Sequence, residues 1–243
     1  MTSSSQKTAI VTGASQGIGA GIVKAFVERG FNVVATSRKV TQSSEIAASD
    51  QVALIDGDIG EQATAAKIVE TALSRFKTID VLVNNAGIFI AKPFTEYTPE
   101  DLKSLVSTNI EGFLYVTQLA IKQMLAQKTG GSIVTITAAL ARNPVRGFTA
   151  AVPMITKGGL ETVTQHLAME YAQDGIRVNA VAPGVVATPL HDNTPRDVMQ
   201  TLSPMGRVST VKEIADAVMY LTDATTVTGD ILYVDGGAHF GRW

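Results

Sequence analysis

The sequence contains no cysteine among its 243 residues, and its three histidines are scattered along the chain. Without cysteine there is no disulfide, no thiolate nucleophile and no cysteine-ligated zinc, and scattered histidines do not make a metal cluster. We therefore expect no metal site. A formal net charge of −2 gives neither a broad basic field for nucleic acid nor a basic patch for a membrane surface. These absences favour a small molecule as the binding partner.

The sequence also lacks long apolar runs. No run approaches the length of a membrane span, and the first residues lack the apolar core of a secretory signal peptide. We expect a cytoplasmic protein. Hydrophobic residues make up 45% of the chain and charged residues 17%, a balance that supports one well-packed core at this length. Residues 1–243 are therefore predicted to form a single domain.

The most informative stretch is residues 7–27, where an apolar run over 8–11 leads into a turn with three glycines and then into a helical pattern. A strand, turn and helix in this order direct backbone N–H groups and the positive end of the helix dipole toward the turn. Glycine lets a pyrophosphate approach the backbone, and at Gly19 it lets the helix pack close to the strand. The motif alone fits either a dinucleotide site or an ordinary glycine-rich turn.

The same alternation of strand and helix continues along the chain. Further strands are predicted over residues 31–36, 52–55, 79–83, 132–137, 176–181 and 230–234, and long helices over 61–76, 98–127 and 153–173. Thr98, Thr194 and Thr210 each begin an N-cap signature. Apolar strands joined by helical crossovers predict a doubly wound α/β fold of Rossmann type, with a seven-stranded parallel sheet. Glycine and proline interrupt the periodicity over residues 184–209. This pattern predicts a substrate-covering loop with a short helix.

Several separated motifs match one family. They are Thr12 to Gly19 after the first strand, Asp58-Ile59 after the third, Asn84 to Gly87 after the fourth, Asn109, Lys157, Pro183-Gly184 with Thr188, and Asp235 to Gly237. With these motifs the chain resembles the short-chain dehydrogenase/reductase family over essentially its whole length, and the 3-oxoacyl-acyl-carrier-protein reductases within it. The resemblance implies a single NAD(P)-binding domain that transfers hydride to or from a small, partly apolar carbonyl, alcohol or imine.

The resemblance also implies which residues bind the cofactor. They are Gly13, Ser15, Gln16, Ile18, Gly19, Arg38, Asp58, Ile59, Asn85, Ala86, Gly87, Lys157, Pro183, Gly184, Val186 and Thr188. Those of the glycine turn would hold the pyrophosphate, Asp58 and Ile59 would flank the adenine, and the last four would surround the nicotinamide carboxamide. Two alternatives stay open, because Asp58 also suits a simple turn and the neighbouring Asn84 also suits a structural role.

The residues after the second predicted strand bear on the choice of cofactor. A carboxylate there would accept hydrogen bonds from a free ribose diol and repel a 2'-phosphate. This chain has Ser37-Arg38-Lys39 instead, with no acid and with a guanidinium. NADP(H) is therefore the preferred cofactor, and NAD(H) is possible. The alternative is that Arg38 is a solvated surface charge.

The chain departs from the family at the catalytic residues. Members use a serine just past the fifth strand and a tyrosine four residues before the lysine, and these stations hold Ala138 and Pro153. Neither side chain can transfer a proton. Lys157 and Asn109 remain as the catalytic residues, with Thr137 and Thr156 as less favoured replacements for the missing hydroxyls. The expected activity is an oxidoreductase with a non-standard proton-transfer apparatus, and the alternative is a dinucleotide-binding sensor or assembly subunit without turnover.

Two further expectations concern the surface. His191, in the predicted covering loop, is either a titrating group near the pocket or an exposed residue. The helices over 98–127 and 153–173 carry more large apolar residues than one buried stripe requires. They are Leu105, Leu114, Leu119, Leu167 and Met169. This surplus predicts a homo-oligomer, a dimer or a tetramer.

Overall fold

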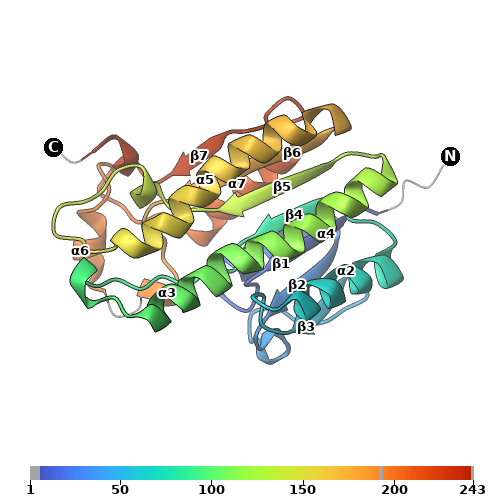
Figure 1. The fold of residues 1–243 in the computed structure, drawn as a ribbon, viewed down its shortest axis with the longest axis horizontal. Coiled ribbons are helices and arrows are strands. Elements are labelled where there is room, and N and C mark those ends of the chain that lie inside the picture. Colours follow the sequence, from blue (N-terminus) through green and yellow to red (C-terminus); the bar gives the residue numbers. More distant parts are fainter. Residues whose placement is uncertain (1–5, 192–193, 242–243) are drawn as a thin grey trace.

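A computed structural model describes residues 6–191 and 194–241, except for the side chain of His191. Within these residues seven parallel strands form one sheet in the order β3-β2-β1-β4-β5-β6-β7 (Figure 1). The strands are β1 Thr8–Thr12, β2 Asn32–Ser37, β3 Val52–Asp56, β4 Val81–Asn84, β5 Gly131–Ile136, β6 Ile176–Pro183 and β7 Ile231–Val234. The predicted single-domain, doubly wound α/β fold is therefore confirmed.

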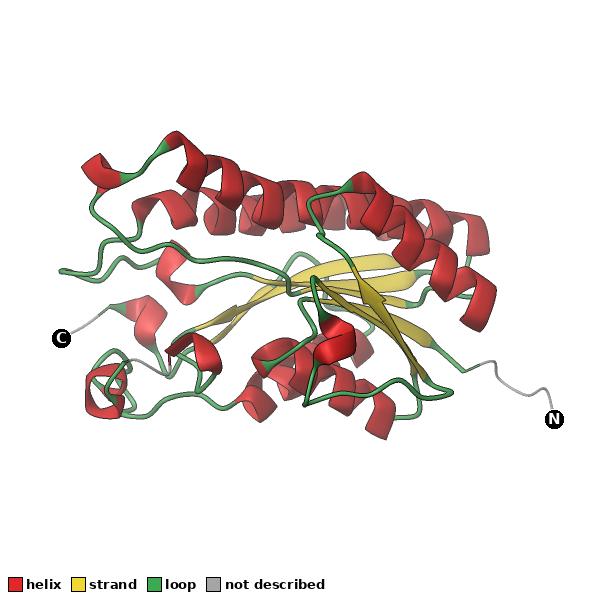
Figure 2. Ribbon diagram, turned by 90° about the horizontal axis from the view of Figure 1, so that it is seen from below, coloured by secondary structure: helices red, strands yellow, loops and turns green. Residues whose placement is uncertain are grey.

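Helices cover both faces of the sheet (Figure 2). The helices within the described residues are α1 Gly17–Glu28, α2 Gln62–Phe76, α3 Pro99–Leu105, α4 Gly112–Gln127, α5 Ala151–Tyr171, α6 Arg196–Gln200 and α7 Val211–Asp223. Side chains alternate between the faces along each strand. In β1, Val11 packs with Phe26 of α1 and Ile214 of α7 in one core cluster, whereas Ile10 packs with Ile68 of α2 in the other. No helix within the described residues is long and apolar enough to cross a membrane.

The strand order reverses between β1 and β4, which are hydrogen-bonded neighbours although two strands separate them in the chain. Ile10 of β1 lies between Val34 of β2 and Leu82 of β4 in the register. From β1 the chain adds β2 and β3 on one side of the sheet, and from β4 it adds β5, β6 and β7 on the other side. In doubly wound folds a crevice for ligands lies at the carboxyl ends of the strands where this reversal occurs. This is where the glycine turn after β1 and the segment after β4 meet.

Two local predictions are confirmed and two need correction. Thr98 and Thr210 both form capping boxes with the residue three positions later. The helix predicted to begin at Thr194 instead begins at Arg196, and Pro195 occupies the N-cap position without a side-chain cap. The helix predicted over 98–127 is interrupted by a π-helical turn, Val106–Glu111, between α3 and α4.

Candidate active site

The glycine turn after β1 is closely packed. Gly13 and Gly17 have positive φ angles of 65° and 58°. A Cβ on Gly19 would lie 2.2 Å from the carbonyl oxygen of Gly13, so only glycine fits there. The side-chain amide of Asn85 donates to the carbonyls of Thr12 and Gly13 at 2.9 and 3.0 Å. The turn is thus held in shape by the chain after β4, with the N-terminal end of α1 beside it.

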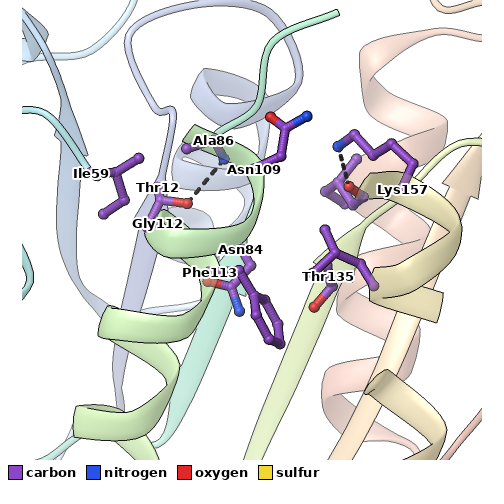
Figure 3. A pocket seen from close by; sticks show the side chains of 11 residues that line it. Thr12, Ile59, Asn84, Ala86, Asn109, Gly112, Phe113, Thr135 and Lys157 are labelled. Atoms are coloured by element: carbon purple, nitrogen blue, oxygen red, sulfur yellow. Dashed lines mark hydrogen bonds between the residues drawn. The ribbon is translucent and has the colours of Figure 1, made fainter. Parts of the chain in front are cut away.

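Thr12 joins the two segments at the switch point, and sequence analysis gave it no role of its own. Its hydroxyl accepts the backbone N–H groups of Asn85 and Ala86 at 3.1 and 3.0 Å, and the second bond is drawn in Figure 3. These bonds tie the end of β1 to the end of β4. The only sequence signal for this role is the position of Thr12 between a buried strand and a glycine.

Asp58 and Ile59 differ in their surroundings. The Asp58 carboxylate accepts the backbone N–H of Gly60 at 2.9 Å, as a turn-forming aspartate does. Ile59 is 7% exposed and packs against Gly112, where a Cβ would lie 2.7 Å from the Ile59 side chain. The structure therefore displays the turn role of Asp58 and a packed position for Ile59 beneath the crevice.

Lys157, on α5, lies partly buried at the centre of the site. Its ammonium donates to the carbonyl of Ile136, the last residue of β5, at 2.8 Å (Figure 3). Burial lowers the pKa of the Lys157 ammonium to about 8. A Cβ on Gly87 would lie 3.1 Å from the Lys157 nitrogen and 3.3 Å from Oδ1 of Asn109. The absence of a side chain at Gly87 therefore keeps the lysine and the asparagine close to the crevice.

Asn109 lies in the π-helical turn and is 2% exposed. Its Oδ1 accepts the backbone N–H of Ile88 at 2.8 Å, and its Nδ2 donates to the Ile88 carbonyl at 3.1 Å and to the Thr156 hydroxyl at 3.0 Å. Both N–H donors of the amide are therefore used within the protein. Asn109 holds the segment after Gly87 against α5, and π-helical turns recur at functional sites.

The two hydroxyls considered as replacements for the missing groups are both engaged elsewhere. Thr156 accepts from Asn109 and donates to the carbonyl of Pro153 at 2.8 Å. Thr137 lies within hydrogen-bond distance of Glu161 at 3.0 Å and of the Val181 carbonyl at 3.3 Å. Both residues are at least 96% buried. Their hydroxyls stabilise the packing of α5 on the sheet.

Ala138 lies close along the chain to a residue that contacts the lysine, and Pro153 lies close to the lysine along its helix. Ala138 lies two residues beyond Ile136, whose carbonyl holds the Lys157 ammonium. Pro153 is the third residue of α5 and precedes Lys157 by one turn, so both project from the same side of the helix. Proline is tolerated there because an N–H in the first turn would have no intrahelical partner.

A small cavity of about 10 Å³ lies between α4, α5 and the ends of β4 and β5 (Figure 3). Lys157 and Asn109 line it, together with Asn84 and Thr135. Asn84 donates to the Thr117 hydroxyl at 2.9 Å, but its buried Oδ1 and the hydroxyl of Thr135 have no partner among the described residues. The cavity has about the volume that one water molecule requires.

A second polar group lies beside the site and was not found from the sequence. Thr137 contacts Glu161, and burial raises the pKa of the Glu161 carboxyl. The Arg142 guanidinium lies 5.9 Å from the ring centre of Tyr233, which stacks on His239 at 4.1 Å. Burial, and then the charge of Glu161, raise the pKa of the Tyr233 hydroxyl. Tyr233 is therefore a weaker acid than a free tyrosine and a poor proton donor near neutral pH.

The two ends of the predicted covering segment are hydrogen-bonded to each other. Val186 forms a parallel bridge with Ser209, and the N–H of Ala187 donates to the Ser209 carbonyl at 2.9 Å. A Cβ on Gly17 would lie 3.4 Å from the Thr188 side chain, so Thr188 reaches the start of α1. Gly184 packs against Asp235 at the end of β7. The hypothesis about His191 falls on a side chain outside the described residues.

The chain after β2 contains a feature that the sequence argument missed. Arg38 is exposed in the turn directly after the strand, a position that is compatible both with a contact to a cofactor and with a solvated surface charge. However, Oε1 of Glu45 accepts the backbone N–H of Gly17 at 3.1 Å. A carboxylate thus lies against the glycine turn, although none follows β2 directly in the sequence.

The glycine turn, the switch point and the lysine together define a Rossmann-type α/β protein with the layout of a dinucleotide site. The family model described as Enoyl-(Acyl carrier protein) reductase matches residues 13–239. The chain is 33% identical over 244 residues to 3beta-hydroxysteroid dehydrogenase 1 of Eggerthella lenta, covering 95% of this chain and 93% of that protein. It is 35% identical over 242 residues to a tropinone reductase homolog of Arabidopsis thaliana, covering 95% and 88%. The chain belongs to the short-chain dehydrogenase/reductase family.

Solved structures are similar over the same length. A 3-ketoacyl-(acyl-carrier-protein) reductase from Brucella melitensis, complexed with NADH, has 32% identity and a TM-score of 0.89, and the match covers 96% of this chain and 98% of that chain. ElxO with NADP bound has 27% identity and a TM-score of 0.88, with 97% and 100% covered. These two relatives hold different dinucleotides on the same fold.

Proposed function

We propose that the protein is an NAD(P)(H)-dependent oxidoreductase that acts on a small, partly apolar carbonyl, alcohol or imine and has an altered proton-transfer apparatus. NADP(H) is the preferred cofactor and NAD(H) a possible one. The observation that carries the proposal is the meeting of Lys157, Asn109 and Gly87 beside the glycine turn at the switch point. Relatives that bind NADH and NADP support the same class of cofactor.

The residues present fit such a cofactor. At the N-terminal end of α1 Glu45 accepts the N–H of Gly17, so the following N–H groups of the first turn would bind a pyrophosphate. Gly13 and Gly17 adopt the positive φ angles of the turn. Gly87 leaves room beside Lys157, and the ammonium of Lys157, held by the carbonyl of Ile136, would orient ribose hydroxyls. A bound nicotinamide would supply the hydride. Thr188, near Gly17, would close the site from the covering segment.

Proton transfer is the step that this chain must perform differently. General acid catalysis and oxyanion stabilisation, which Ala138 and Pro153 cannot provide, are together worth on the order of 5 to 8 kcal/mol of transition-state stabilisation. Simple ketones should therefore react slowly. The ammonium of Lys157, with a pKa of about 8, carries an exchangeable proton near neutral pH. These features favour an activated electrophile, such as an iminium, or a substrate that brings its own proton.

The second candidate is a dinucleotide-binding protein without turnover, acting as a sensor or as an assembly subunit. The observation that favours it is the same pair, Ala138 and Pro153, with the hydroxyls of Thr137 and Thr156 engaged elsewhere. Both candidates require dinucleotide binding. They differ in whether the protein oxidises reduced nicotinamide when offered a panel of aldehydes, ketones, imines and quinones.

The test of the site restores the missing hydroxyls. The double variant Ala138→Ser with Pro153→Tyr would set a phenol beside the Lys157 ammonium, which would lower the tyrosine pKa. Reduction of a small activated ketone should rise at least about tenfold over the parent, and neither single variant should match the pair. Ala138→Ser with Pro153→Phe is the matched control, because it has the ring without the hydroxyl.

Cofactor affinity and thermal unfolding are measured for every variant, so a folding defect is separated from a chemical one. A parent already as fast as the double variant would show that another group supplies the proton. A parent that binds dinucleotide but reduces no substrate of the panel would support the second candidate. A parent that binds neither NADPH nor NADH would contradict both.

We also propose a homo-oligomer, a dimer or a tetramer, built on exposed apolar residues of α4 and α5. Of the five apolar residues predicted for the interface, the structure leaves only two well exposed. Leu105 is fully buried, and Leu119 and Leu167 pack against the core of their own chain. Leu114 and Met169 are 42% and 82% exposed, so these two residues support the proposal.

A further inference from the structure

Helix α1 begins without a cap from its own sequence. Gln16 holds the N-cap position in an extended conformation, and its side chain makes no hydrogen bond to the first turn, which also contains no acidic residue. The first N–H groups of a helix have no intrahelical acceptor, and together with the helix dipole they attract an anion. The start of α1 is therefore open to a negatively charged group from elsewhere.

That group is the carboxylate of Glu45, in the crossover from β2 to β3. Its Oε1 accepts the N–H of Gly17, the first residue of α1, at 3.1 Å. The next N–H groups, those of Ile18 and Gly19, have no acceptor within the described residues. In Rossmann-type folds this end of the first helix is the place where a pyrophosphate binds. The carboxylate thus takes one of the donors that a pyrophosphate would use.

The backbone around Glu45 is fixed by contacts within the chain. The hydroxyl of Ser43 donates to the carbonyl of Ser15 at 2.6 Å, and it accepts the backbone N–H of Glu45 at 3.1 Å. Ile46 packs against the core cluster beneath α1. These contacts hold the crossover beside the glycine turn without help from a ligand, so the carboxylate is at the start of α1 before any cofactor arrives.

The side chain of Glu45, unlike the backbone, has room to move. It is 36% exposed, and its Oε2 lies 3.6 Å from the ammonium of Lys24, about two turns along α1. Rotation about the side-chain bonds would release Gly17 and leave the carboxylate beside Lys24 at the surface. An exposed pair of this kind contributes little to stability, so it neither drives nor prevents the rotation. The contact with Gly17 is therefore one that a competing anion can replace.

A pyrophosphate and this carboxylate would compete for the start of α1. A pyrophosphate bound to the N–H groups of Ile18 and Gly19 would lie directly beside a carboxylate bound to Gly17. Two anions at one helix end repel each other, and each reduces what the other gains from the dipole. Displacement of the carboxylate removes the repulsion, but the free protein then loses the cap of its first helix.

We propose that Glu45 is an intramolecular competitor of the pyrophosphate, which closes the start of α1 in the free protein and leaves it when a dinucleotide binds. This inference rests on the proposed dinucleotide-dependent function. The contact stabilises the free protein and lowers the affinity for any ligand that carries a pyrophosphate. NADH and NADPH are affected by the same factor, because they share this group.

The test removes the competing carboxylate in two variants. Glu45→Gln removes the charge and keeps an oxygen that can accept from Gly17, whereas Glu45→Ala removes both. In each variant the affinity for NADH, NADPH and adenosine diphosphate ribose should rise about three- to tenfold, the range expected for a charge at a helix end. Calorimetry measures these three affinities. The affinity for adenosine, which has no phosphate, should not change in an NMR titration.

Thermal unfolding of the ligand-free variants gives a second readout. Loss of the cap should lower the unfolding midpoint of Glu45→Ala by about 2 to 4 °C, and that of Glu45→Gln by less. Higher affinity together with lower stability is expected of a group that competes with the ligand. Glu28→Gln is the matched control, because Glu28 is an exposed acid at the far end of α1. It should leave the affinities unchanged and should not lower the midpoint.

Unchanged or lower affinity in both variants, with a parent that binds all three pyrophosphate ligands, would overturn the inference and leave the proposed function in place. A gain for NADPH alone would also overturn it, because both dinucleotides carry the pyrophosphate. An unchanged midpoint in Glu45→Ala would remove the capping role and, with it, the competition. If the parent and both variants bind none of the three ligands, the inference and the proposed function fail together.

Discussion

The lysine at the centre of the site should lower the stability of the protein without cofactor. Burial lowers the pKa of Lys157 from 10.5 to about 8, which corresponds to about 3 kcal/mol against the charged form, at ~1.4 kcal/mol per pKa unit. The hydrogen bond to the Ile136 carbonyl offsets about 1 kcal/mol of this. A Lys157→Met variant, which fills a similar volume without charge, should therefore be more stable by about 2 kcal/mol at pH 7.

The pH dependence of the stability difference between Lys157→Met and the parent shows whether the buried charge causes it. Because the folded-state pKa lies below the unfolded value, the penalty is complete below about pH 8, falls as the pH rises from 8 to 10.5, and is absent above 10.5. The stability advantage of Lys157→Met should accordingly shrink toward zero across this window. Urea unfolding between pH 6 and 10.5, without dinucleotide, measures it.

Lys122→Met is the matched control, because Lys122 is exposed on α4 and its replacement should not produce this pH dependence. A Lys157→Met variant that is less stable than the parent at pH 7, or whose stability difference is independent of pH, would refute the reasoning. The same variant should bind dinucleotide more weakly, since a thioether cannot hydrogen-bond ribose hydroxyls as an ammonium does. A residue kept at a cost in stability for the sake of a ligand is typical of functional sites.

Two other predictions concern the support of the site and the outer helices. Thr156→Val leaves a buried N–H of Asn109 without its acceptor and should destabilise the protein by about 1 to 3 kcal/mol in urea unfolding, whereas Thr156→Ser should retain most of the stability. A Thr156→Val variant as stable as the parent, with the loss confined to Thr156→Ser, would show that the methyl group, and not the hydroxyl, matters. Light scattering at micromolar concentration should give a multiple of 25.6 kDa, and Leu114→Glu with Met169→Glu should reduce it. A monomer mass for the parent would contradict the proposed assembly.

The fold could be predicted because its signals are local. Each strand is a short apolar run and each long helix has its own periodicity, and seven such strands with crossovers leave few topologies. The capping boxes at Thr98 and Thr210 are local as well, since three residues suffice to form them. The close fit of Gly19 to the strand followed from the same kind of motif.

The parts that could not be predicted depend on contacts between distant residues. Glu45 meets Gly17 across 28 positions and Thr156 meets Asn109 across 47, and neither pair leaves a periodic trace in the sequence. The π-helical turn around Asn109 could not be predicted either, because its signal in the sequence is weak. One extra residue within a helix shifts the apolar stripe too little to be seen against ordinary scatter, although it changes where the asparagine points.

The lowered pKa of Lys157 and the replacement of the usual serine and tyrosine by Ala138 and Pro153 concern the same proton-transfer step. A buried lysine beside a tyrosine stabilises the phenolate, and the two groups then share one proton-transfer function. In this chain Pro153 supplies no phenol, so burial acts on Lys157 alone and brings its pKa to about 8. A group with that pKa is partly charged and partly neutral near neutral pH, which is the condition for moving a proton in either direction. In the proposed chemistry the Lys157 amine therefore carries the exchangeable proton in place of a tyrosine phenol. Substrates with an intrinsically acidic or cationic reacting centre are the ones that this replacement would favour.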